Sequence, residues 1–131
     1  MIFLDTCALV FDALAPKRLS AKALRAIEQG EENSALACSD ISLWEIAMLV
    51  ARGRLEPGTD VVSFLKLVLA SLVIRPLPIT PEIAGISAND DLFTHHDPAD
   101  RIVAATALHY GGPLVTCDRT LQAVKGLKII W

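Results

Sequence analysis

Hydrophobic and polar positions along the chain alternate between short apolar runs and stretches with the apolar spacing of amphipathic helices. Short apolar runs bounded by turn residues are typical of buried strands. Strands are predicted at 2–5, 35–38, 73–77, 114–116 and 127–130. This alternation predicts an α/β fold in which helices cover a parallel or mixed central sheet.

Capping residues, glycines and prolines mark the predicted helix boundaries. Helices are expected around 7–14 before Pro16, from Ser20 to Glu28 before Gly30, from Ser39 or Asp40 to about Arg52 before Gly53, from Thr59 or Asp60 to about Leu72, over 81–88 after Thr80-Pro81, and from Pro98 to His109 before Gly111. Residues 89–96 are expected to form a polar loop. The chain contains no linker, repeat or low-complexity stretch, so we interpret residues 1–131 as one domain.

Two aspartates directly follow predicted strands. Asp5 ends the first apolar run, and Asp118 comes just after Thr116 and Cys117 at the end of another. The carboxyl ends of parallel strands are where such sheets build their ligand sites. Either aspartate alone could be only a turn or cap residue, but the hydroxyls of Thr6 and Thr116 stand beside them and could orient a carboxylate or a bound water.

The start of the last predicted helix holds two more aspartates. Asp97 before Pro98 suits an N-cap, and this structural role accounts for it. Asp100 differs, because its spacing to Val103 and Ala107 places it on a stripe that should face the core. An unpaired buried carboxylate is costly and a bound cation relieves that cost, so we favour a functional role for Asp100.

Glu45 permits two interpretations. The segment Ser42-Leu43-Trp44-Glu45 matches a capping box, in which Glu45 would only bond back to the start of its helix. Residues 41–50 are apolar nearly all round, however, which predicts a helix buried on both sides, against the sheet and often against a second subunit. The residues alone leave both roles open.

Asp5, Glu45, Asp100 and Asp118 together offer oxygen ligands from four separate segments. Such carboxylate-rich sets suit Mg²⁺ or Mn²⁺, whereas zinc favours Cys or His. The histidines at 95, 96 and 109 do not have zinc-ligand spacing, and exposure or loop packing explains them. Crowded carboxylates have raised pKa values until a cation arrives, and a bound ion can activate a water and stabilise a phosphoryl oxygen. The set therefore predicts metal-dependent attack on a phosphodiester.

Composition narrows the class of protein. The net charge of −3 argues against a protein that simply coats nucleic acid, but not against an enzyme that cuts it. Candidate basic patches comprise Lys17, Arg18, Lys22, Arg25, Arg52, Arg54, Arg101 and Arg119, with ordinary solvated surface as the alternative for most of them. Arg101 and Arg119 each follow a site aspartate, which makes them candidates for substrate binding.

Cysteine usage and hydropathy indicate the compartment. The three cysteines are widely spaced and form no Cys-x-x-Cys pair, which predicts reduced thiols in a cytoplasmic protein. No apolar run reaches the roughly 20 residues that cross a bilayer, and the first residues do not resemble a signal peptide. We therefore expect a cytoplasmic protein that does not insert into a membrane.

Four segments carry a family resemblance. They are Leu4-Asp5-Thr6-Cys7-Ala8-Leu9, Ser42-Leu43-Trp44-Glu45-Ile46-Ala47, His96-Asp97-Pro98-Ala99-Asp100-Arg101-Ile102-Val103-Ala104-Ala105-Thr106-Ala107 and Leu114-Val115-Thr116-Cys117-Asp118. In this order and spacing they span essentially the whole chain, which resembles a PIN-domain ribonuclease of the VapC type, the toxin of bacterial toxin–antitoxin pairs. Each segment is a weak signal alone, and together they are specific.

The resemblance implies a three-layer α/β/α sandwich around a mainly parallel sheet. It implies Mg²⁺- or Mn²⁺-dependent endonucleolytic cleavage of RNA that leaves a 5′-phosphate and a 3′-hydroxyl. It carries over Asp5, Glu45, Asp100 and Asp118 as the acidic site, with Asp5 and Asp100 as direct metal ligands, and so favours the functional role of Glu45. It also implies a homodimer that is inhibited by a small cognate antitoxin, whose C-terminal segment blocks the site.

Two other classes compete with this interpretation. A haloacid-dehalogenase-like phosphatase also has an aspartate after its first strand, but it needs a second one two residues later, where this chain has Cys7. Cys7 and Cys117 also depart from the residues of many PIN relatives, although neither is a ligand. A non-catalytic PIN-like module that binds RNA or protein would be expected to lose acidic ligands, and this chain keeps all four. The binding module is retained as the alternative.

Overall fold

The computed structural model describes residues 1–94 and 96–131, in which five strands form one sheet in the order β3-β2-β1-β4-β5. The strands are β1 (Ile2–Leu4), β2 (Leu36–Ser39), β3 (Arg75–Leu77), β4 (Leu114–Val115) and β5 (Ile129–Ile130). Every neighbouring pair is parallel. The predicted α/β fold with a parallel sheet is therefore confirmed.

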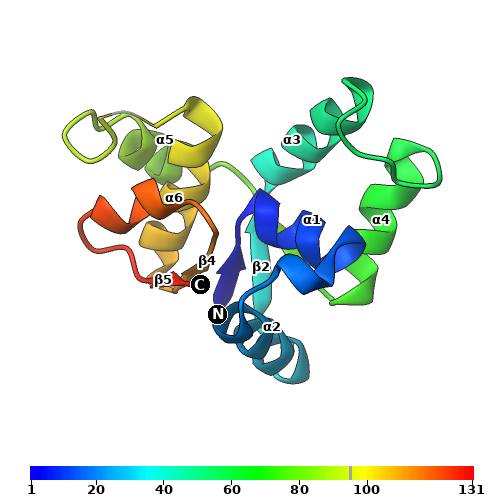
Figure 1. Cartoon of the computed structure of the whole chain (residues 1–131). Coiled ribbons are helices and arrows are strands. Elements are labelled where there is room, and N and C mark those ends of the chain that lie inside the picture. The colour runs from blue at the N-terminus through cyan, green and yellow to red at the C-terminus, as the bar shows by residue number, and fades with distance from the viewer. Residues whose placement is uncertain (95) are drawn as a thin grey trace.

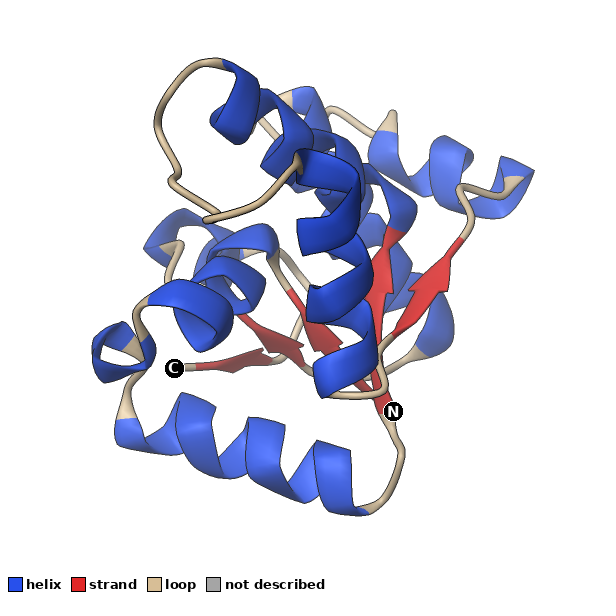
Figure 2. Ribbon diagram, turned by 90° about the vertical axis from the view of Figure 1, so that its right-hand side faces the viewer, coloured by secondary structure: helices blue, strands red, loops and turns tan. Residues whose placement is uncertain are grey.

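Helices cover both faces of this sheet (Figures 1 and 2). They are α1 (Thr6–Leu14), α2 (Ala21–Glu32), α3 (Asp40–Ala51), α4 (Val61–Ser71), α5 (Pro81–Ser87) and α6 (Pro98–Tyr110), with 3-10 turns at η1 (Pro16–Arg18) and η2 (Arg119–Ala123). Successive strand residues point to opposite faces. Leu4 and Leu36 therefore pack with α1, α2 and α4, whereas Phe3 and Ala37 pack with α6. Two apolar cores, one on each face, make the three-layer α/β/α sandwich.

The strand order reverses beside β1. The chain passes from β1 to β2 to β3 in one direction and then returns through α5 and α6, which places β4 on the free side of β1. Phe3 pairs with Leu114 and Leu4 pairs with Val115, so the carboxyl ends of β1 and β4 lie side by side. Such a reversal opens a crevice at the carboxyl ends of the strands, where α/β proteins bind their ligands.

The helix boundaries largely follow the predicted caps. The side chains of Ser20, Ser39, Asp60, Thr80 and Asp97 each accept a hydrogen bond from a backbone N–H at the start of a helix. Gly111 ends α6 with a φ of 73°, a conformation that favours glycine. His95, in the predicted loop 89–96, lies outside the described residues. Among the described helices, none is long and apolar enough to span a membrane.

The prediction that Gly30 ends its helix is wrong. α2 continues to Glu32, and Gly30 is buried within it. A Cβ at this position would lie 2.3 Å from Cδ2 of Leu36 and 3.4 Å from Cδ1 of Ile2. Gly30 is therefore explained by the close approach of α2 to β1 and β2 and not by helix termination.

In the single chain α3 is buried on one side only, and the predicted packing of its other side against a second subunit stays a prediction. Ser42 and Ile46 are its buried residues, whereas Trp44 is 55% exposed. The apolar positions of α3 therefore exceed what the sheet covers.

Candidate active site

Asp5 lies directly after β1 and caps the start of α1. Its Oδ1 accepts a hydrogen bond of 2.7 Å from the backbone N–H of Thr6, and its Oδ2 accepts one of 2.6 Å from Oγ1 of Thr116. Burial raises the pKa of Asp5 above its usual value, and these two hydrogen bonds offset part of that rise. Asp5 thus combines a capping role with a carboxylate held across the point where the strand order reverses.

Thr116 joins the two aspartates that follow strands. Its Oγ1 donates to Asp5 and accepts a hydrogen bond of 3.0 Å from the backbone N–H of Asp118. Asp118 caps η2, because its Oδ1 accepts from the backbone N–H and the hydroxyl of Thr120 at 3.0 and 2.6 Å. The cap accounts for one oxygen of Asp118, and its Oδ2 takes no part in these bonds.

Glu45 does not belong to a capping box. α3 begins earlier, and Oγ of Ser39 caps it by accepting a hydrogen bond of 3.2 Å from the N–H of Ile41. Oε1 of Glu45 accepts instead a hydrogen bond of 2.5 Å from Oγ1 of Thr6, which also lies 2.9 Å from Oγ of Ser42. Burial raises the pKa of Glu45, and the bond from Thr6 offsets part of the rise. Thr6 therefore links α3 to the start of α1.

Asp100 is half-buried in the first turn of α6. Oδ1 of Asp97 accepts a hydrogen bond of 2.8 Å from its backbone N–H, which confirms the capping role predicted for Asp97. Among the described residues, no hydrogen-bond donor reaches the Asp100 carboxylate itself. Burial, followed by the negative charges of Asp97, Asp5, Asp118 and Glu45, raises the pKa of Asp100 to about 7. A neighbouring cation would relieve both effects.

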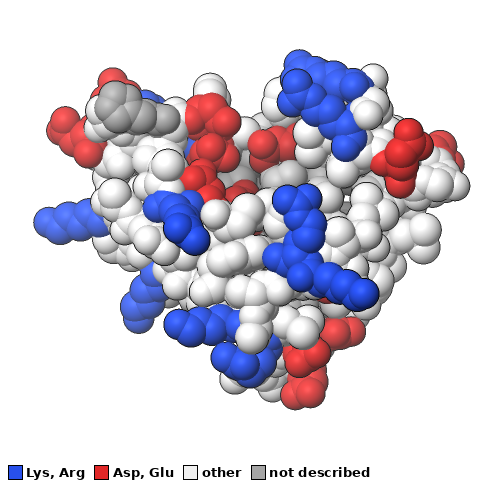
Figure 3. Space-filling model, viewed as in Figure 1, with Lys and Arg blue, Asp and Glu red and all other residues white. Residues whose placement is uncertain are grey.

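These groups line one cavity of about 380 Å³. Asp5, Glu45, Asp100 and Asp118 all contribute to it, beside an apolar wall of Val10, Phe11, Leu49 and Leu55. Figure 3 shows acidic side chains in the hollow between the α6 and α3 sides of the molecule. Within the described residues, however, no three acidic, imidazole or thiol groups approach closely enough to form a finished metal site. The carboxylates are neighbours around a cavity and not a closed cage.

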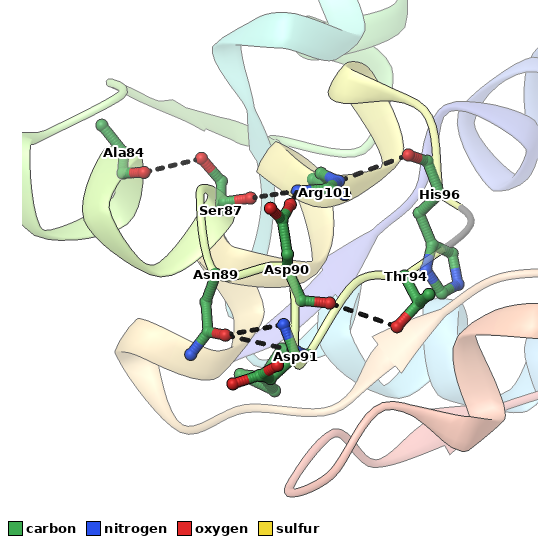
Figure 4. Close-up of polar contacts among 9 residues, drawn as sticks. Ala84, Ser87, Asn89, Asp90, Asp91, Thr94, His96 and Arg101 are labelled. Carbon is green, nitrogen blue, oxygen red and sulfur yellow. Dashed lines mark hydrogen bonds and ion pairs between the residues drawn. The ribbon is translucent and has the colours of Figure 1, made fainter.

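The two arginines predicted to bind substrate, Arg101 and Arg119, are not among the residues that line the acidic cavity. The Arg101 guanidinium pairs with Asp90 at 2.9 Å and donates to the carbonyl oxygens of His96 and Ser87 at 3.3 and 3.4 Å. Figure 4 shows Arg101 between Ser87 and His96, with Asp90 beside it. These contacts hold the loop between α5 and α6. Arg119 is exposed at the start of η2.

Arg18 does line the acidic cavity, although the sequence identified it only as one of several candidate basic-patch residues. Its guanidinium lies over the ring of Phe11, 4.2 Å from the ring centroid. Cys7 and Cys117 also line the cavity, and the backbone N–H of Cys117 donates to Sγ of Cys7 at 3.3 Å. Burial raises the pKa of the Cys7 thiol, so it is neutral at physiological pH.

The chain belongs to the PIN domain family, whose model matches residues 2–127. It is 34% identical over 122 residues to Ribonuclease VapC22 of Mycobacterium tuberculosis, an alignment that covers 93% of this chain and 90% of that protein.

Solved structures of low sequence identity share the fold. One is VapBC2 from Rickettsia felis bound to a DNA fragment from the promoter, with a TM-score of 0.74, 18% identity and coverage of 98% of this chain and 97% of that chain. Another is DNA-bound VapBC from Salmonella typhimurium, with a TM-score of 0.69, 21% identity and coverage of 98% and 95%. A third is FitAcB from Neisseria gonorrhoeae, with a TM-score of 0.68, 23% identity and coverage of 98% and 96%.

Proposed function

We propose that this protein is a Mg²⁺-dependent endoribonuclease that acts as the toxin of a toxin–antitoxin pair in the cytoplasm. The observation that carries the proposal is the single cavity lined by Asp5, Glu45, Asp100 and Asp118 where the strand order reverses. Membership of the PIN family and 34% identity to a ribonuclease support it. The products would be a 5′-phosphate and a 3′-hydroxyl.

The donor set fits a hard divalent cation. Its ligands are carboxylate oxygens, as Mg²⁺ and Mn²⁺ prefer. Asp5 and Asp100 would hold the ion, because both are desolvated and the negative charge of Asp5 contributes to the raised pKa of Asp100. A cation held there would supply Lewis-acid chemistry, lowering the pKa of a water and stabilising negative charge on a phosphoryl oxygen.

The remaining groups orient the carboxylate of Asp5, accept a proton or add negative charge to this site. Thr116 and the N–H of Thr6 fix the two oxygens of Asp5. Glu45 has a raised pKa and a hydrogen bond from Thr6, which makes it a positioned proton acceptor for an attacking water. Asp118 keeps one oxygen outside its cap and adds negative charge that strengthens cation binding.

A cognate antitoxin is the proposed partner, since the structural neighbours include toxin–antitoxin complexes. An apolar surface suits it, because Val62 and Leu67 of α4 are 57% and 63% exposed. Leu67 also lines a cavity of about 310 Å³ together with Leu14 and Phe64. A short amphipathic antitoxin helix would bury these side chains. A homodimer is also proposed, and sedimentation of the purified toxin tests it.

Cleavage of total cellular RNA by purified, antitoxin-free protein tests the activity. The wild type with Mg²⁺ is compared with an Asp5→Asn, Asp100→Asn double variant. An Asp12→Asn, Asp91→Asn variant removes the same charge outside the cavity and serves as the matched control. We expect discrete cuts by the wild type and the control, abolished by a chelator and by the site variant.

Equal cleavage by all three proteins would identify contamination and contradict the proposed catalysis. The alternative, a non-catalytic PIN-like module that binds RNA or protein, would then be the favoured interpretation. Circular dichroism of each variant separates loss of activity from loss of fold.

A further inference from the structure

A second cavity adjoins the acidic one. It measures about 400 Å³ and lies between α3 and the start of α6. Trp44, Met48, Arg52, Arg54 and Pro98 are among its lining residues. Glu45 and Leu49 line both cavities, so the two cavities adjoin along α3, and together they are called the groove.

The far end of this groove carries two exposed arginines at the end of α3. The backbone N–H of Arg54 donates to the carbonyl oxygen of Leu49 at 2.9 Å, and the N–H of Gly53 donates to that of Val50 at 3.0 Å. Gly53 has a φ of 70°, which closes this turn. The backbone of Arg52 and Arg54 is therefore fixed to a rigid helix end. Figure 3 shows basic side chains gathered at this end of α3.

Neither arginine is neutralised by an acidic partner in the described part of the chain, where Arg101 and Asp90 form the ion pair. Arg52 and Arg54 flank a site that carries several negative charges and must nevertheless admit a phosphate backbone. Positive groups beside such a site attract the substrate and offset the repulsion. Arg18 adds a third positive group, because it lines the acidic cavity itself.

Trp44 adds an aromatic face to the groove. Its side chain is 55% exposed although α3 offers buried positions on its other side. An exposed indole beside free guanidinium groups is the combination by which proteins bind single-stranded nucleic acid, since bases stack on the ring and arginines contact phosphates. The guanidinium groups of Arg52 and Arg54 in the lining favour such a polyanion over the apolar face of a second subunit.

We infer that the groove formed by Trp44, Arg52 and Arg54 binds the single-stranded RNA segment that flanks the scissile bond. One base stacks on the indole of Trp44, and the following phosphates contact Arg52 and Arg54. The cut bond then lies over the carboxylates, with Arg18 on its other side. This inference rests on the proposed function, because it names the substrate path of the same site.

Binding is tested without cleavage, in an Asp100→Asn background, with a fluorescein-labelled single-stranded RNA of about 12 nucleotides. An added Arg52→Gln, Arg54→Gln pair should weaken binding about tenfold or more at low salt and reduce the slope of log affinity against log salt by about 1. A Lys125→Gln, Lys128→Gln pair removes the same charge from the exposed segment before β5 and should leave both values nearly unchanged. Equal effects of the two pairs would overturn the inference.

Stacking is tested at Trp44 in the same background. Trp44→Ala should weaken RNA binding about fivefold or more, and Trp44→Phe should retain most of the affinity. A separate variant keeps Trp44 and replaces the other tryptophan, Trp131→Phe, in the Asp100→Asn background. RNA should quench the fluorescence of its remaining indole, Trp44, in a saturable manner. Unchanged RNA affinity in Trp44→Ala, combined with a shift from dimer to monomer in sedimentation, would assign this face to a second subunit and overturn the inference.

The outcomes separate this inference from the proposed function. RNA binding that depends on the groove, without any cleavage by the wild type, would support the groove and contradict the nuclease. If the wild type cleaves RNA and the groove variants cleave it with the same KM and kcat, the proposed nuclease function is supported and the inference about the groove is overturned.

Discussion

Oγ1 of Thr116 donates a hydrogen bond of 2.6 Å to Oδ2 of Asp5, although 111 positions separate the two residues in the chain. Both are buried, at 1% and 6% exposure. The contact ties the end of β4 to the end of β1 and fixes one proposed metal ligand. It also limits the rise in the pKa of Asp5 that burial causes.

Thr116→Val should therefore lower RNA cleavage and move the acid limb of its pH profile to higher pH. The variant removes the hydrogen bond that favours ionised Asp5, so the pKa of Asp5 rises and a higher pH is needed to ionise it. Leaving a buried carboxylate oxygen without its donor should also cost about 1–3 kcal/mol of unfolding free energy. Thr116→Ser keeps the hydroxyl and should restore the profile. Rate measurements across pH and urea unfolding check both effects, and a Val variant with the wild-type profile would contradict them.

Asp100→Asn should abolish cleavage and yet stabilise the metal-free protein at pH 8. The folded-state pKa of Asp100 is about 7 against an ordinary value of 3.8, so folding takes up a proton between these pH values. Stability therefore falls as pH rises from the ordinary pKa through the folded-state pKa of about 7, and the loss is complete only when the pH is well above that value. Because the carboxylate is only half-buried, solvent screening reduces the effect to about 1–2 kcal/mol. Thermal unfolding at pH 5 and pH 8 measures it, and equal stability differences at both pH values would refute the assignment.

Mg²⁺ or Mn²⁺ should stabilise the wild type more at pH 8 than at pH 5. A cation binds the ionised carboxylates, and at pH 5 the proton on Asp100 competes with it. The ion should raise the melting temperature of the wild type but not that of Asp100→Asn. A chelator should return the melting temperature of the wild type to the value of the metal-free protein. A shift that persists in Asp100→Asn would place the ion elsewhere.

Gly30→Ala and Gly85→Ala should change stability in opposite directions. Both glycines lie in helices, where alanine is intrinsically favoured by about 1 kcal/mol. At Gly30 the new methyl group would lie 2.3 Å from Cδ2 of Leu36, and overpacking of this kind costs about 1–3 kcal/mol. At Gly85 no atom outside the helix lies within 4 Å of the new Cβ. Urea unfolding should show a loss for Gly30→Ala and a gain for Gly85→Ala, and a gain for both would disprove the close approach.

Arg101→Gln should expose the loop between α5 and α6 to proteolysis without a large loss of RNA affinity. The variant loses the hydrogen bonds to the carbonyl oxygens of Ser87 and His96 and the ion pair with Asp90. The Asp90 side chain is 87% exposed, so the ion pair itself contributes less than about 1 kcal/mol. Asp90→Asn removes the ion pair alone, so its loop should resist proteolysis better than the loop of Arg101→Gln. A strong loss of RNA affinity in Arg101→Gln would instead support the substrate-binding role predicted from the sequence.

The sequence allowed the sheet and the helix caps to be predicted because both depend on local patterns. Short apolar runs identified the strands, and Asp97-Pro98 and Thr80-Pro81 identified two helix starts. Gly30 was misassigned because the close approach to Leu36 is a property of packing and leaves no local signal. The capping-box motif at Ser42 was misleading for a similar reason, since a real cap at Ser39 preceded it.

The site was predictable as a set of residue types and not as a geometry. The spacing of Asp100 to Val103 and Ala107 placed it on a stripe that faces the core; Val103 and Ala107 are buried, and Asp100 itself is half-buried. The contacts of Arg101, in contrast, depend on how the loop at 87–96 folds over α6. Likewise, the share of α3 that the sheet leaves uncovered follows from tertiary packing, which its apolar sequence alone did not define.

The central place of β1 in the sheet bears on how the protein is made. Ribosomes release the N-terminus first, so β1, β2 and Asp5 emerge well before β4, which begins at Leu114. Until β4 inserts, one edge of β1 has no neighbour, and Asp5 lacks Thr116 while Asp118 is still unmade. The nascent chain therefore holds an incomplete set of carboxylates, and the cavity with all four of them forms only after the final strands have been added.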